Sequence, residues 1–255
     1  HEAVATVAGR SSAPSGQLVA YAPPTIRRFD CGDGARVHGA RGGERVTLVG
    51  ANLGATLASL ERVVIDDGSA SHPVDTAQCA LATPHTALVC LTPAGPVGAR
   101  LTWHLLVGGL ASTAPSTATP PPRIIAVRTV AEDGGALPTG GGGRFVVDGA
   151  HFGVLLARVE RVALVVPNGG AERVATECEI VDADISLACT APPGAGRGMR
   201  VRVTVGGQRS APSASSGAGT LDYARPRLDA MAEADAPPTR GGILRLSGAE
   251  LGGGL

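Results

Sequence analysis

The chain contains no lysine and very few aromatic side chains. All 22 of its basic residues are arginines, and 22 acidic residues balance them to a formal net charge of zero. This balance excludes the basic surface with which proteins bind nucleic acids or anionic membranes, so no nucleic-acid partner is expected. Aromatic residues make up 2% of the chain, against 44% for all hydrophobic residues. We therefore expect cores that are packed with Val, Leu, Ile and Ala.

The sequence signatures of catalysis and of cofactor binding are also missing. Without lysine there can be no phosphate-binding P-loop, and no Gly-x-Ser-x-Gly nucleophile motif occurs. The six histidines are scattered, and none has a cysteine or carboxylate at metal-ligand spacing. We therefore expect a protein that is not an enzyme, with no catalytic residue, no cofactor and no metal.

Membrane and glycosylation signals are scarce too. The chain has no run of about 18 apolar residues, which a membrane helix needs, so no direct membrane insertion by this segment is expected. Its first residues lack the basic and apolar regions of a secretory leader. Neither asparagine lies in an Asn-x-Ser/Thr sequon, which excludes N-glycans. The Ser/Thr/Pro-rich segments 111–120 and 210–216 are either solvated loops or carriers of O-glycans.

The chain does contain an internal repeat of 99 residues. Three segments combine a Gly-rich turn, an alternating strand and the ending Gly-Ala-x-(Leu/Phe)-Gly; they are residues 42–54, 141–153 and 240–252. The cysteines keep the same period, since Cys79 maps onto Cys178 and Cys90 maps onto Cys189. A fixed period of this length is typical of an array of structural repeats.

The period divides the chain into two complete repeats and two partial ones. Residues 21–119 and 120–223 form the complete repeats. Residues 1–20 resemble the last strand of a preceding repeat, and residues 224–255 resemble the start of a further one. We therefore expect a segment of a longer array, with at least four repeats represented. Prolines at the three boundaries stiffen the connections, which favours a rod over loosely tethered domains.

The strands of the repeat alternate with a period of two. In residues 200–205 the valines share one face, while arginine and threonine share the other. Leu101, Trp103, Leu105 and Val107 likewise share a face. One buried and one solvated face is typical of an antiparallel sheet. Short strands at this density, separated by Gly, Pro and Asp turns, predict an all-β fold of tandem β-sandwiches.

Each complete repeat holds a cysteine pair that we expect to form a disulfide. Cys79 and Cys90 flank a turn near Pro84, and Cys178 and Cys189 flank a turn at residues 182–184. Two strands folded at these turns would bring each pair within bonding reach. Closing a loop of a dozen residues would contribute about 3 kcal/mol, and disulfides imply an oxidising compartment. The alternative is two buried free thiols per repeat.

Cys31 stands outside this pattern. The equivalent position in the second repeat is near Thr129, so no second cysteine follows the period here. Cys31 could pair outside this segment, link two chains or stay free. A partner outside the segment is the interpretation that we prefer.

Three acidic groups are candidate oxygen donors for Ca²⁺. They are Asp66 with Asp67, Asp182 with Asp184, and Asp30 with Asp33. The first two groups occupy non-equivalent positions in the two repeats, which favours solvated turn carboxylates over a shared metal site. The third group lies near a repeat boundary, where a metal could stiffen the joint, but an unmetallated turn is again the preferred interpretation.

As a set, these motifs resemble the IPT/TIG domain. In the first repeat the Pro-Pro-x-Ile start, the Gly-rich strand, the two cysteine motifs and the closing Val-Gly-Gly are residues 23–26, 42–54, 79, 88–93 and 107–109. In the second repeat they are residues 121–124, 141–153, 178, 187–192 and 205–207. The resemblance covers essentially the whole chain. His151 and Glu250 replace an Asn of the pattern, which we expect to weaken a turn hydrogen bond without threatening the fold.

The resemblance implies tandem Ig-like β-sandwiches in a large extracellular glycoprotein, at the cell surface or at the surface of a cilium. IPT/TIG arrays with paired cysteines occur in plexins, growth-factor receptors, fibrocystin-like ciliary proteins and adhesion receptors. The implied role is structural and adhesive, as a rod that spaces or mediates contacts with other protein chains, further repeats or glycans. Two alternatives are a subunit of a polymeric extracellular fibre or coat, and accessory domains of a carbohydrate-active enzyme.

Overall fold

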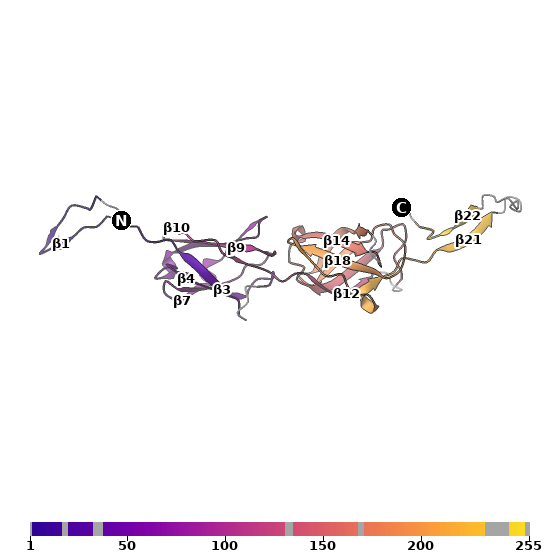
Figure 1. Ribbon diagram of the computed structural model, residues 1–255, viewed down its shortest axis with the longest axis horizontal. Coiled ribbons are helices and arrows are strands. Elements are labelled where there is room, and N and C mark those ends of the chain that lie inside the picture. Colours follow the sequence, from indigo (N-terminus) through magenta and orange to yellow (C-terminus); the bar gives the residue numbers. More distant parts are fainter. Residues whose placement is uncertain are drawn as a thin grey trace.

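The computed structural model describes residues 2–16, 20–32, 38–130, 135–167, 171–232 and 245–252. Within these ranges the regular structure is nearly all strand, and the helices are single 3-10 turns such as η1 (Leu57–Ser59) and η3 (Leu156–Arg158). None of these helices has the length or the apolar character that crossing a membrane requires. Two β-sandwiches follow one another along the long axis, with a short hairpin beyond each of them (Figure 1).

The first sandwich is built from two antiparallel sheets. One has the strand order β3-β4-β8-β7, and the other has the order β10-β9-β5-β6, with β11 also paired to β9. In chain order these are the A-B-E-D and C′-C-F-G sheets of the immunoglobulin fold. The strands are β3 (Thr25–Asp30), β4 (Arg45–Ala51), β5 (Leu60–Asp66), β6 (Ser71–Val74), β7 (Cys79–Thr83), β8 (Ala87–Leu91), β9 (Leu101–Val107), β10 (Leu110–Ala111) and β11 (Ser116–Thr117).

The second sandwich repeats this topology. Its sheets have the orders β12-β13-β17-β16 and β15-β14-β18-β19, with β20 paired to β18. The fold is thus all-β, with tandem Ig-like sandwiches, as the sequence predicts. The strands are β12 (Arg123–Thr129), β13 (Arg144–Ala150), β14 (Val159–Val165), β15 (Glu172–Val174), β16 (Thr176–Asp182), β17 (Ser186–Thr190), β18 (Met199–Val205), β19 (Gln208–Arg209) and β20 (Thr220–Leu221).

The predicted alternation places the cores between the sheets. Along β18 every second residue is buried, and the arginines between them are half-buried on the outer face. β9 follows the same pattern and buries Trp103, whose ring lies 5.5 Å from that of Phe29. The indole Nε1–H donates to the hydroxyl of Thr117 at 2.9 Å. The single tryptophan is therefore fixed at the centre of the first sandwich.

The two outer hairpins copy parts of the complete sandwiches. In the hairpin of β1 (Thr6–Val7) and β2 (Arg10–Ser11), the hydroxyl of Ser12 accepts the N–H of Ala5 at 3.1 Å. Ser112 accepts the N–H of Leu105 at 3.0 Å in the same way after β9. At the other end, β21 (Arg227–Ala232) and β22 (Arg245–Ala249) pair antiparallel in the register of β3 with β4.

Candidate functional site at the junction of the two sandwiches

The two sandwiches meet end to end through loops that the sheets hold in place. The first sandwich contributes the turn after β5, the loop before β9 and Thr119. The second contributes η3 and the turn between β18 and β19. The described ranges contain no group of three or more His, Cys, Asp or Glu residues that could hold a metal.

An apolar contact forms the centre of the junction. Val97 and Ala40 belong to the first sandwich, yet both are buried within the hydrophobic core of the second, each with 3% of its surface exposed. Gly206 makes this approach possible, since a Cβ at this position would lie 2.7 Å from the carbonyl oxygen of Val97. The core of the second sandwich therefore extends across the junction to two residues of the first.

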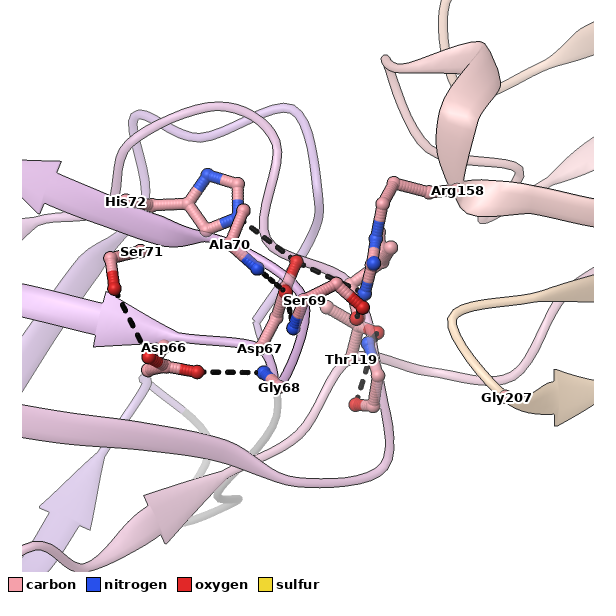
Figure 2. A network of polar contacts seen from close by, with 12 residues as sticks. Asp66, Asp67, Gly68, Ser69, Ala70, Ser71, His72, Thr119, Arg158 and Gly207 are labelled. Carbon is pink, nitrogen blue, oxygen red and sulfur yellow. Dashed lines mark hydrogen bonds and ion pairs between the residues drawn. The ribbon is translucent and has the colours of Figure 1, made fainter.

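A buried ion pair lies beside this apolar contact. Asp67 Oδ2 lies 3.1 Å from Nη2 of Arg158, which reaches across from the second sandwich, and 2.9 Å from Nε2 of His72 (Figure 2). The Asp67 side chain is fully buried, and 12% of the Arg158 side chain is exposed. Nη2 of Arg158 also donates to the carbonyl of Val97 at 3.3 Å. Arg158 therefore links the ion pair to the apolar contact.

The turn that carries Asp67 is preorganised by its own hydrogen bonds. Oδ1 of Asp67 accepts the N–H groups of Ser69 and Ala70, each at 2.9 Å (Figure 2). Burial on its own raises the pKa of Asp67, but these two N–H groups, His72 and Arg158 outweigh it, so the pKa lies below its ordinary value. Asp67 is therefore an anion at neutral pH.

A second, more exposed charge contact runs in the opposite direction. Arg41 of the first sandwich lies 3.7 Å from Asp182 and 3.9 Å from Asp184 of the second, and it donates to the carbonyl of Ala183. Half of the Arg41 side chain is exposed, so this contact contributes little to stability on its own. Asp184 is fixed by the N–H of Gly153, which it accepts at 2.9 Å. Each sandwich thus contributes one arginine that contacts aspartate side chains of the other.

The connecting segment is held as well. The side-chain amide of Gln208 donates to the carbonyl of Thr119 at 3.0 Å and contacts its hydroxyl at 3.2 Å. The N–H of Thr119 in turn donates to the carbonyl of Gly98 at 2.9 Å. Thr119 is the last residue before three consecutive prolines, so the connection has little freedom to bend at its start.

The structure corrects the interpretation as solvated turn carboxylates for one aspartate in each of the first two acidic groups. The Asp67 side chain and Asp184 are buried, and each lies within ion-pair distance of an arginine of the other sandwich, whereas Asp182 is exposed. Of the third group, Asp30 accepts the N–H of Gly32 at 3.0 Å in a local turn. Asp33 lies outside the described residues.

The cysteine pairs are joined in the structure. Cys79 faces Cys90 directly in the register of β7 and β8, and their Cα atoms are 4.1 Å apart with an S–S distance of 2.03 Å. Cys178 and Cys189 are joined with the same Cα separation in the second sandwich. Cys31 is half-buried and packs against the core of the first sandwich. A partner of Cys31 outside this segment stays a prediction.

Comparisons with known proteins give weak likenesses. No family model matches the chain, and no curated protein matches its sequence. A similar solved structure is SGBP-B from a xyloglucan utilization locus in Bacteroides uniformis, with 15% identity over 78% of this chain and 49% of that one, at a TM-score of 0.28. The plexin A4 extracellular region has 11% identity over 89% of this chain and 28% of that one, at a TM-score of 0.30.

A third similar structure is the FN1–FN3 segment of chicken CNTN1, with 12% identity over 88% of this chain and 76% of that one, at a TM-score of 0.24. The chain thus spans about half of the length of SGBP-B and about a quarter of that of plexin A4. At these TM-scores the likenesses carry no argument about what the chain binds.

The roles of Arg41, Arg158 and Val97 were not predicted from the sequence. One signal was available in the repeat itself. Position 67 of the first repeat is Asp, while the equivalent position 166 of the second is Val, and Arg158 corresponds to Ser59. Opposite charges thus occur at the two positions that meet at one junction, and uncharged residues occur at the equivalent outer positions.

Proposed function

We propose that the chain is a non-catalytic segment of an extracellular surface protein, in which Ig-like sandwiches of the IPT/TIG type form a stiff rod. The rod spaces or presents contacts with other proteins or glycans. The observation that carries this proposal is the junction, where Val97 and Ala40 enter the core of the next sandwich beside the Asp67–Arg158 pair. Such a contact resists bending, because bending would expose apolar surface and separate a buried ion pair.

Two further features support an extracellular setting. Each sandwich contains one disulfide, and disulfides persist in oxidising compartments. The motif set of the repeat resembles the IPT/TIG arrays of cell-surface and ciliary-surface proteins, in which adhesion is a common role. Placement at the cell surface, including that of a cilium, is part of the proposal.

Solution scattering combined with NMR relaxation tests the stiffness of the rod. We expect the chain to give one narrow, elongated distance distribution, and amides of both sandwiches to report one shared anisotropic tumbling. Asp67→Ala should broaden the distribution and separate the two tumbling rates. Arg128→Ala is the matched control, since it removes an exposed ion pair within the second sandwich, 3.2 Å from Asp148. Independent tumbling of the two sandwiches in the unmodified chain would contradict the proposal.

A further inference from the structure

The end of the first sandwich where the chain arrives carries a hollow of about 350 Å³. Its wall is formed by the arriving segment at residues 21–24, by the ends of the strands and by the turns between them. Residues that line it include Asn52, Gly54, Ser59, His85, Gly108 and Leu110. This end lies opposite to the one that enters the second sandwich.

The lining residues correspond by repeat position to the residues with which the second sandwich receives the first. Gly54 corresponds to Gly153, Ser59 to Arg158, and Gly108 to Gly206. At the internal junction, Cγ1 of Val97 from the first sandwich lies 3.4 Å from the position that a Cβ on Gly153 of the second sandwich would occupy. The hollow is therefore equivalent to the surface of the second sandwich that the first sandwich covers at the internal junction.

The turns that shape both surfaces have the same backbone. Asn52 and His85 have φ values of 60° and 63°, and the corresponding His151 and Asp184 have 64° and 67°. The N–H of His85 donates to the carbonyl of Gly54 at 2.7 Å, and the N–H of Asp184 donates to the carbonyl of Gly153 at 2.8 Å. The hollow is thus already in the conformation that docks a sandwich in the second repeat.

The chemistry of the hollow differs at several positions, and two of them decide which sandwich end it can receive. Ser59 stands where Arg158 stands in the second sandwich, and Leu110 stands where Gln208 stands. An aspartate in the position of Asp67 would be buried here without its arginine, which is strongly unfavourable. The hollow therefore fits a sandwich end with an apolar residue at that position, such as Val166 in the second sandwich.

We propose that this hollow is the docking surface for a preceding sandwich of the same kind, whose end carries an apolar residue in place of Asp67. The inference rests on the proposed function, because it extends the stiff rod by one junction. It names the partner by its chemistry: an apolar side chain in the place of Val97, a backbone carbonyl above Gly108, and no buried charge.

A chain with a duplicated second sandwich tests this directly. Residues 120–223 are placed before residue 22, so that Tyr223 replaces Tyr21. Hydrogen exchange of the amides in residues 52–59 and 107–110 is compared with that in the unmodified chain. Docking should slow exchange in these segments about tenfold. Equal exchange in the two chains, with the duplicated core itself protected, overturns the proposal.

Two glycines provide a matched pair of variants. A Cβ on Gly108 or on Gly109 has nothing within 4 Å in this chain, and both residues have positive φ. Only Gly108 corresponds to Gly206, which lies against Val97, whereas the counterpart of Gly109, Gly207, has nothing within 4 Å. Since Asn tolerates this backbone region, Gly108→Asn should abolish the slowed exchange and Gly109→Asn should leave it. Retained protection in Gly108→Asn counts against the proposal.

The selectivity for an uncharged end has its own test. When residues 21–119 are duplicated instead, Asp67 of the added copy faces Ser59, and we expect no protection. Ser59→Arg in the receiving sandwich should restore it. Protection that does not depend on Ser59→Arg overturns the chemical selectivity. The proposed function is tested separately, because free bending at the internal junction of the unmodified chain would contradict it whatever happens at the hollow.

Discussion

Asp67 and Arg158 form an ion pair across two sandwiches with an N–O distance of 3.1 Å, and the carboxylate is completely buried. Nε of Arg158 is also buried and has no hydrogen-bond partner among the described residues. A buried pair with an unsatisfied donor contributes less to stability than to the choice of partner, because desolvation offsets much of the attraction. We therefore expect the pair to act mainly in selecting which sandwich ends can join.

The first prediction concerns this choice of partner. Asp67→Val or Arg158→Ser alone leaves one buried charge without its partner and should destabilise the junction by about 3 kcal/mol. The double variant Asp67→Val/Arg158→Ser reproduces the residues that the sequence has at Val166 and Ser59. It should be less destabilised than either single variant. Hydrogen exchange of Gly206 and Thr119 measures the opening of the junction, and additive single effects in the double variant would contradict this account.

The second prediction concerns the left-handed turn after β13. His151 has a φ of 64°, and Asn52 has a φ of 60° at the equivalent position, where its side chain donates to the carbonyl of Pro23 at 3.2 Å. The Asn side chain adds a donor for the backbone carbonyl at the equivalent place, so His151→Asn should stabilise the second sandwich by about 1 kcal/mol. Thermal unfolding by circular dichroism measures the change. Asn52→His should shift the first sandwich in the opposite direction, and a shift of the same sign would contradict the explanation.

The third prediction concerns the disulfides. Cys79→Ala/Cys90→Ala opens a loop with a sequence separation of 11 residues and should lower the stability of the first sandwich by about 3 kcal/mol. Because Trp103 is the only tryptophan, its fluorescence during urea unfolding reports that sandwich alone. Non-reducing peptide mapping should show both bonds in native protein. Four free thiols there would remove the argument for an oxidising compartment.

The fourth prediction concerns pH. Burial lowers the pKa of His38 below 6.5, although the Gly39 carbonyl and Glu44 act in the opposite direction. Above pH 6.5 neither state binds the proton, so stability is unaffected. Below pH 6.5 the unfolded chain binds it and the native chain does not. Stability therefore falls with pH down to the native pKa, by at most about 1.4 kcal/mol per pH unit.

Urea titrations between pH 7.5 and 5, followed by Trp103 fluorescence, measure this slope. His38→Gln should flatten it, because the amide can keep the contact that His38 Nε2 makes with Thr117 at 3.1 Å. His104→Gln, at an exposed position on β9, is the control. The lowered pKa of Asp67 places its own loss of stabilisation below pH 3.8, outside this window. An unchanged slope in His38→Gln would assign the effect to another group.

The fold could be predicted from the sequence because a single sandwich follows local rules. The alternation along residues 199–205 and the turn residues between strands are each determined within a few positions. The junction could not be predicted in this way. Asp67 and Arg158 meet only because two whole sandwiches are placed end to end, and each residue on its own resembles an ordinary surface charge. Comparison of the two repeats even argued against a site common to both, since Asp67 and Asp184 occupy different positions of the repeat.

The position of the disulfides has a mechanical consequence. The chain enters the first sandwich at β3 and leaves it after β11, so a force along the rod acts on these strands first. The loop between Cys79 and Cys90 lies outside this path and is closed by a covalent bond. Under tension the sandwich would unfold and extend, but the disulfide would keep this loop closed. The extension per sandwich would therefore be about 35 Å shorter than that of the same chain without the bond. A pulled array of such sandwiches would therefore lengthen in steps shorter than its residue count implies.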